Sequence, residues 1–234
     1  MVGRFVWADL RGGDPALARA FYGAVLGWSW VTDEEGNGVF ACASGPVAGL
    51  PAADGAPYWV PYLVTAQLSA STSHLKVLRD EDVPGVGRIA RCVDPVGAEL
   101  NLFMPTAPLT LSAVAPCGTF CWFEHVGDSA ASFQLFQRFA GWTPMGEIGL
   151  GPNGIYRLFG VDGTAWGGFL DHDPARGSPR WRLYVRVSDA EAVAVAIVES
   201  GGTVQHGPAL ISGGGKVVIG RDDQGAEFAV MQTP

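Results

Sequence analysis

The sequence predicts an α+β protein built from two tandem domains, each with two modules of a strand, a helix and several further strands. Three observations lead to this prediction. Four short motifs of the first half return in the same order in the second half. Two apolar helical patterns each end at a Gly-Trp pair. The 33 glycines and 16 prolines divide much of the remaining chain into short extended runs, as in strands joined by turns.

The internal repeat is the strongest of these observations, because its motifs keep their order. The pairs are FVWAD at 5–9 and FCWFE at 120–124, GW at 27–28 and 141–142, WVPY at 59–62 and WRLY at 181–184, and DPVGAEL at 94–100 and DDQGAEF at 222–228. In the first pair the two aromatic residues and the acid alternate, so they share one face of a strand. Longer spacing in the second half indicates loop insertions in a related domain.

The first helix of each half has recognisable ends. Asp14 and Pro15 are typical of a helix start, because aspartate accepts hydrogen bonds from free amide groups and proline fits the first turn. Apolar residues then recur at helical spacing until Gly27, which ends the helix. In the second half Asp128 or Ser129 caps the corresponding helix, and it also ends at a glycine.

Short runs bounded by glycine, proline or aspartate complete each half as strands. In the first half we expect strands over 28–32, 38–43, 46–50, 58–64, 88–93 and 99–103, and a second helix over 66–78. In the second half we expect strands over 181–187, 203–205, 216–221 and 227–231, and a second helix over 189–200. Residues 79–87 are few, which leaves open whether one strand of the first half is missing there.

Length and composition fit this organisation. The 234 residues are enough for one or two domains, and 48% of them are apolar, so a large core can be buried. The domains are expected at residues 1–108 and 116–234, with a linker over residues 104–116 that is rich in proline, threonine and alanine. The 8 tryptophans favour either aromatic-lined cavities or a core of large residues.

The charge and the cysteines exclude several classes of function. A formal net charge of −8 and the lack of a basic stripe make nucleic acid an unsuitable partner. The sequence has no signal-peptide pattern and no run of about 18 apolar residues, so we expect a cytoplasmic protein without a membrane partner. The 4 cysteines form no paired CxxC motif, so reduced and mostly buried thiols are expected rather than a zinc site.

Two motifs resemble those of a known superfamily. The run DP…AFYG…LGW within residues 14–28 and the run RCVDPVGAEL at residues 91–100 look like the vicinal oxygen chelate superfamily, which contains glyoxalase I, bleomycin-resistance proteins and extradiol dioxygenases. The resemblance covers nearly the whole chain, twice. It implies glyoxalase-like domains in which paired βαβββ modules form a curled mixed sheet around a cavity. These motifs are typical of the fold and not of one reaction.

The resemblance also implies where a metal binds in the members that use one. Their His, Gln or Glu ligands usually lie on the first strand, on the strand that opens the second module, and on the last strand. Glu99 and Glu227 hold the last-strand position. The other positions carry tryptophan, namely Trp7 and Trp122 on the first strands and Trp59 and Trp181 on the opening strands. Because a divalent ion needs at least three good ligands, no metal cofactor is expected, and a divalent metal stays as the alternative.

Several of these residues have two readings as a binding site. The four tryptophans either line a pocket for a flat or apolar ligand or fill the core. Tyr62 and Tyr184 are expected on the inward face of their strands, beside Trp59 and Trp181, where a phenol orients a ligand or satisfies a buried acid. Asp9 and Glu124 could each add a carboxylate to a pocket.

The two glutamates are the candidate catalytic residues. Glu99 and Glu227 are residual metal ligands, an acid/base, or anchors for a polar ligand; alternatively each pairs with an arginine near the strand end. The histidines do not occupy matching positions in the two halves and show no metal-ligand spacing. The turn at residues 171–174 contains His172 between two aspartates, and we expect it to be solvated rather than to hold a cation.

Three hypotheses about function follow. The leading one is a small-molecule-binding protein of the glyoxalase/bleomycin-resistance type without a catalytic metal, with an aromatic or apolar ligand. The second is a metal-dependent lyase, isomerase or dioxygenase, or a hydroxylase-like enzyme, of the same superfamily. The third is a structural or interaction domain with filled cavities. The chain is expected to act as a monomer or a homodimer.

Overall fold

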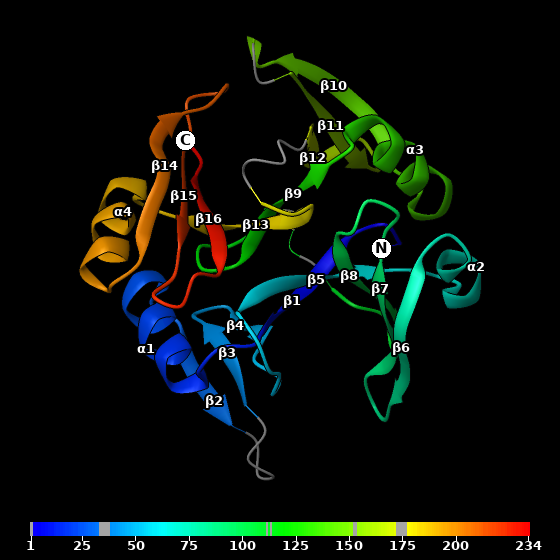
Figure 1. Cartoon of the computed structure of the whole chain (residues 1–234), viewed down its shortest axis with the longest axis horizontal. Coiled ribbons are helices and arrows are strands. Elements are labelled where there is room, and N and C mark those ends of the chain that lie inside the picture. Colours follow the sequence, from blue (N-terminus) through cyan, green and yellow to red (C-terminus); the bar gives the residue numbers. More distant parts are fainter. Residues whose placement is uncertain (1, 33–37, 111, 113, 152–153, 172–176) are drawn as a thin grey trace. The chain divides into compact units, whose positions relative to one another are not determined.

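The computed structural model describes residues 2–32, 38–110, 112, 114–151, 154–171 and 177–234 (Figure 1). The first half contains β1 (Phe5–Arg11), α1 (Pro15–Leu26), β2 (Ser29–Thr32), β3 (Gly38–Cys42), β4 (Gly45–Gly49), β5 (Tyr58–Val64), α2 (Leu68–Thr72), β6 (Lys76–Val83), β7 (Gly87–Val93) and β8 (Glu99–Pro105). The second half contains β9 (Phe120–Gly127), α3 (Ser129–Ala140), β10 (Thr143–Gly149), β11 (Ile155–Val161), β12 (Thr164–Asp171), β13 (Arg180–Val187), α4 (Ala190–Glu199), β14 (Thr203–Leu210), β15 (Lys216–Arg221) and β16 (Glu227–Gln232).

Each half forms one mixed sheet, and the two sheets have the same strand order. In the first half the order of the eight strands is β2-β3-β4-β1-β5-β8-β7-β6, and in the second it is β10-β11-β12-β9-β13-β16-β15-β14. The pairs β1–β4, β5–β8, β9–β12 and β13–β16 are parallel, and the outer pairs of each module are antiparallel. The predicted α+β fold, with two βαβββ modules in each half, is confirmed.

The predicted helix ends are confirmed as well. The Asp14 side chain accepts hydrogen bonds from the amides of Ala16 and Leu17, at 2.7 and 3.3 Å, at the start of α1. Gly27 follows α1 with a φ of +67°, a left-handed conformation that glycine adopts without strain. Asp128 is the residue that caps α3, through a 3.0 Å bond from the amide of Ala131.

The expected helix over residues 66–78 is wrong in extent. The segment forms only the short α2, because Gln67 provides no side-chain cap and only Leu68 and Ser71 are buried. The chain then forms the edge strand β6, which pairs with β7 and is fixed there by the ion pair of Asp80 and Arg88. No strand of the first half is missing. Its exposed apolar residues hid the strand from a search for apolar alternation.

The chain also divides into two compact units, and each combines modules from both halves. Unit 1 comprises Met1–Val6, Pro61–Leu111 and Phe123–Trp181, and unit 2 comprises Trp7–Val60, Ser112–Trp122 and Arg182–Pro234. Within unit 2, α1 packs against α4, and within unit 1, α2 packs against α3. β8 continues to Pro105, so the connection between the sheets covers residues 106–119.

Aromatic side chains dominate the core of each unit. In unit 1 the rings in mutual contact include Phe5, Phe123, His125, Phe136, Trp142, Phe159, Phe169 and Trp181. In unit 2 they include Phe21, Tyr22, Trp28, Phe40, Trp59, Phe120 and Phe228. Within the described residues, none of the helices is long and apolar enough to cross a membrane.

Candidate functional site

Two of the predicted binding residues, Trp59 and Trp181, lie in the aromatic cores. Trp59 is 5% exposed and donates its indole N–H to the Tyr22 hydroxyl at 3.0 Å. Trp181 is 3% exposed and contacts the ring of His125 edge-on. The expectation that they share a face with Tyr62 and Tyr184 is wrong, because side chains alternate along a strand and each pair is three residues apart. Core filling, the alternative reading, describes both tryptophans.

Trp7 and Asp9 form a polar pair on β1, within unit 2. The indole Nε1 of Trp7 donates to Asp9 Oδ1 at 3.1 Å, and Asp9 is 7% exposed. Gly49 is the partner of Asp9 on β4, and a Cβ there would lie 2.3 Å from the carboxylate oxygen. The sequence therefore brings a carboxylate, an indole and a close backbone together, as the shared strand face predicted.

Within unit 1, β5, β7 and β8 place polar side chains in one row. Asn101 on β8 is the cross-strand partner of Tyr62 on β5 and of Arg91 on β7. These three residues lie on the face of the sheet opposite to Leu100 and Leu102, which are fully buried. The row combines a carboxamide, a phenol and a guanidinium.

Glu99 lies at one end of this row. It forms an ion pair with Arg91, and the two side chains are 17% and 27% exposed. Asn101 is far more buried, at 3%, and its Nδ2 has no hydrogen-bond partner in the described parts of the chain. The row thus runs from a partly exposed ion pair to an unpartnered buried amide, and the sequence motifs did not single out Asn101.

Within unit 2, β13, β15 and β16 form the corresponding face of the second half. Here Ala229 is the cross-strand partner of Tyr184 and of Ile219, so the middle of the row is apolar. Trp122 and Met231 pack against this cluster. Trp122 and Tyr184 therefore lie together, as part of an apolar surface.

Glu227 is buried beside this surface with an arginine partner. Arg182 donates from Nε to Glu227 Oε1 at 2.8 Å, and the two side chains are 10% and 9% exposed. With its amide nitrogen toward Glu227 and its oxygen toward Arg221, Gln205 bridges these residues at 3.3 and 2.9 Å. Both predicted catalytic glutamates are therefore ion-paired with arginine, as one of the alternatives proposed.

Glu124 lies on β9, within unit 1, and is 5% exposed. Its partner on β12 is Gly168, where a Cβ would lie 2.3 Å from the Tyr156 ring. A glycine at this position leaves space for that phenol. Tyr156 therefore belongs to the surroundings of Glu124, although no repeated motif marked it.

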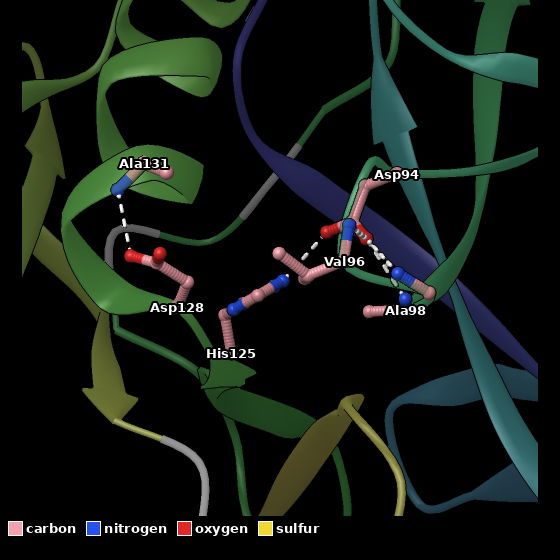
Figure 2. A network of polar contacts seen from close by, with 7 residues as sticks. Asp94, Val96, Ala98, His125, Asp128 and Ala131 are labelled. Carbon is pink, nitrogen blue, oxygen red and sulfur yellow. Dashed lines mark hydrogen bonds and ion pairs between the residues drawn. The ribbon is translucent and has the colours of Figure 1, made fainter.

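Two buried aspartates outside the predicted site join modules of different halves. In unit 1, Asp94 accepts bonds from the amides of Val96, Gly97 and Ala98 through Oδ1, while Oδ2 is 2.7 Å from His125 Nε2 (Figure 2). His125 and the Asp94 side chain are fully buried. The close-up shows the imidazole pointing from β9 to the turn that carries Asp94 (Figure 2).

The corresponding aspartate of unit 2 has a different partner. Asp222 accepts from the amides of Gln224 and Ala226, and the Tyr22 hydroxyl donates to its Oδ2 at 3.1 Å. Burial raises the pKa of Asp222 above its ordinary value. Burial also raises the pKa of Tyr22 well above its usual range. Both aspartates come from the repeated D-x-x-G-A-E motif, which is the sequence signal for them.

The residues of this chain do not fit a catalytic metal. Where the structure describes the chain, no three His, Cys, Asp or Glu side chains come together as a metal-binding group. Glu99 and Glu227 each face an arginine, which stays charged at any working pH and repels a cation. His172 lies outside the described residues.

Comparison with known proteins supports the resemblance. No family model matches the chain. CFP32 of Mycobacterium tuberculosis, which carries a provisional glyoxylase name, is 28% identical over 246 residues, 97% of this chain and 93% of that protein. The anthracycline biosynthesis protein DnrV of Streptomyces peucetius is 26% identical, over 97% of this chain and 92% of that protein.

Solved structures show the same fold. A Mn(II)-bound glyoxalase from Novosphingobium aromaticivorans superposes with a TM-score of 0.69 at 16% identity, covering 99% of this chain and 82% of that one. A 2,2',3-trihydroxybiphenyl 1,2-dioxygenase from Sphingomonas wittichii superposes with a TM-score of 0.72 at 12% identity, covering 99% and 91%.

The fold and the repeated modules define a two-domain, glyoxalase-like protein. The chain belongs to the vicinal oxygen chelate superfamily, as its sequence motifs predicted.

Proposed function

We propose that this chain is a small-molecule-binding protein of the glyoxalase/bleomycin-resistance type that works without a catalytic metal. One observation carries the proposal: the glutamate at the superfamily's last-strand metal position is neutralised by an arginine in both halves. Glu99 pairs with Arg91 and Glu227 pairs with Arg182. The two arginines come from different strands, β7 and β13, so the pairing arose in two ways.

The Glu227 pair shows the physical reason most clearly. Both side chains are about nine-tenths buried, so the charges are stable there only as a pair. A divalent cation bound to Glu227 would have to compete with the bonded guanidinium and tolerate its charge. We infer that the arginine takes the place that a metal holds in other members.

The surface beside Glu227 indicates the class of ligand. Tyr184, Val217 and Ala229 form an apolar cluster, with Trp122 and Ile219 packed against it. Aromatic and aliphatic walls with few polar groups suit a flat, largely apolar molecule. The relative DnrV is named for anthracycline biosynthesis, and anthracyclines contain a planar aromatic ring system. An aromatic ligand is therefore our proposal for this chain.

Metal analysis tests the proposal. The chain is purified without chelator, equilibrated with Mn(II), Fe(II), Ni(II) or Zn(II), desalted, and analysed by mass spectrometry of the elements. We expect less than about 0.1 metal ion per chain, with no difference between the wild type and Glu227→Gln. Stoichiometric metal that is lost in Glu227→Gln would overturn the metal-free function.

A metal-dependent lyase, isomerase or dioxygenase is the second candidate. The retained Glu99 and Glu227 favour it, because a carboxylate at this position is what the metal-using members need. Turnover of glyoxal adducts or catechols that requires added metal and disappears in the Glu99→Gln/Glu227→Gln double variant would support it. Turnover that does not change in the double variant would exclude the carboxylates from the reaction.

A further inference from the structure

The geometry points to Asn101 as the residue that recognises an oxygen acceptor on the ligand, such as a ring carbonyl. This inference rests on the proposed function and gives the ligand one more property: a planar aromatic molecule that carries a carbonyl or similar oxygen. The following observations all concern side chains of unit 1.

The first observation is the unpartnered amide. Asn101 is 97% buried by its 3% exposure, and its Nδ2 lacks a hydrogen-bond partner within the described residues. A buried N–H without an acceptor costs stability, so native structures rarely keep one without a reason. An acceptor supplied by a ligand would satisfy it.

The second observation is where the amide lies. Its cross-strand partners are Tyr62 and Arg91, and Phe103 contacts the Tyr62 ring edge-on, with centroids 6.2 Å apart. The row therefore offers aromatic edges for a flat ring beside one amide donor. The Arg91–Glu99 pair at the end of the row is partly exposed, so the row is reached from solvent at that end.

The third observation is the second half, which shows that the fold does not need the amide. Ala229 occupies the corresponding position between Tyr184 and Ile219, and it is fully buried. The same strands pack there without a polar side chain. The carboxamide of Asn101 is therefore a feature of the site and not of the sheet.

Two probes isolate the carbonyl. Anthraquinone-2-sulfonate and anthracene-2-sulfonate share a planar tricyclic shape and a sulfonate, and they differ in the two carbonyl oxygens. Their dissociation constants are measured by calorimetry for the wild type, Asn101→Leu and the matched control Ala229→Ser. One neutral hydrogen bond is expected to contribute up to about tenfold in affinity.

We expect the wild type and Ala229→Ser to prefer the quinone by about tenfold, and Asn101→Leu to lose that preference without weakening the hydrocarbon. Because leucine removes an unpartnered amide, the Tm of free Asn101→Leu should rise, by about 2–4 °C. An equal loss of affinity for both probes, an unchanged preference, or a lower Tm would overturn the role of Asn101 and leave the proposed function standing. If the wild type binds neither probe, the proposed aromatic ligand is wrong and this inference falls with it.

Discussion

The polar row of the first half and its counterpart in the second half lie on the same strands of the repeated fold and differ in chemistry. Arg91, Asn101 and Tyr62 make the first row polar, whereas Ile219 and Ala229 make the second apolar around Tyr184. Only the tyrosine is retained. Duplication has therefore preserved the sheets while the two faces diverged, and the halves should not be treated as two copies of one site.

The buried aspartates give a second comparison between the units. Asp222 is satisfied by Tyr22, whose hydroxyl also accepts from Trp59. Phe136 occupies the position of Tyr22 in the second half, five residues before the glycine that ends the helix, and it has no hydroxyl. His125 instead satisfies Asp94 from the strand, where the first half has Leu10. One requirement, a second partner for a buried carboxylate, is met from two elements.

The largest expected effect is that of His125→Leu, which gives β9 the residue found in β1. Asp94 Oδ2 would lose its partner in a fully buried place, at a cost of about 3 kcal/mol in the free energy of unfolding. Urea denaturation measures the change. Adding Asp94→Asn should recover part of the loss, and a single variant as stable as the wild type would show that Asp94 does not need the histidine.

Tyr22→Phe is the matching change in unit 2 and should cost less, about 2 kcal/mol. The substitution removes the acceptor for Trp59 and the donor for Asp222, but two backbone amides still bind that carboxylate. The same denaturation experiment measures it. A loss larger than that of His125→Leu would contradict the comparison between the two aspartates.

The pH dependence of stability should differ between the two aspartates. Because burial raises the pKa of Asp222 in the folded state above the ordinary 3.8, the folded chain holds this proton more tightly than the unfolded chain. The contribution is present below pH 3.8 and is lost as pH rises through the folded pKa. Asp222→Asn should remove this fall, an effect smaller than that of Tyr22→Phe. An unchanged slope between wild type and variant would contradict it.

The smallest effect concerns the cysteines, and it checks burial in both units. Burial raises the pKa of Cys92 in unit 1 to about 11 and that of Cys121 in unit 2 to about 12, whereas Cys117 is exposed. Near pH 8 the two buried thiols should therefore react at least about 100-fold more slowly than Cys117. Mass spectrometry after timed labelling measures the rates, and equal rates at Cys92 and Cys117 would show that unit 1 opens readily.

Much of the fold could be predicted because its signals are local. Asp14 and Gly27 mark the ends of α1 through capping and a left-handed turn, and both signals return in α3. The edge strand β6 could not be predicted this way. Its residues Val77 and Leu78 are both about half exposed, so no apolar alternation reveals it.

The site was less predictable because it depends on contacts between strands. The pairing of Glu227 with Arg182 joins β16 to β13, and spacing along the chain does not specify it. Trp59 was assigned to the wrong face because the motif was read as a block, without the alternation that separates it from Tyr62. Asn101 lies just beyond a repeated motif, and comparing it with Ala229 would have revealed the difference.

The central claim is that arginine replaces the metal at both glutamates. Anomalous diffraction from crystals grown with excess Mn(II) tests it most directly, since the scattering identifies the ion and its position. We predict that Arg91 and Arg182 remain paired with Glu99 and Glu227 and that no manganese peak lies within about 2.5 Å of either carboxylate. A manganese ion coordinated by Glu99 or Glu227, with the arginine displaced, would contradict the account.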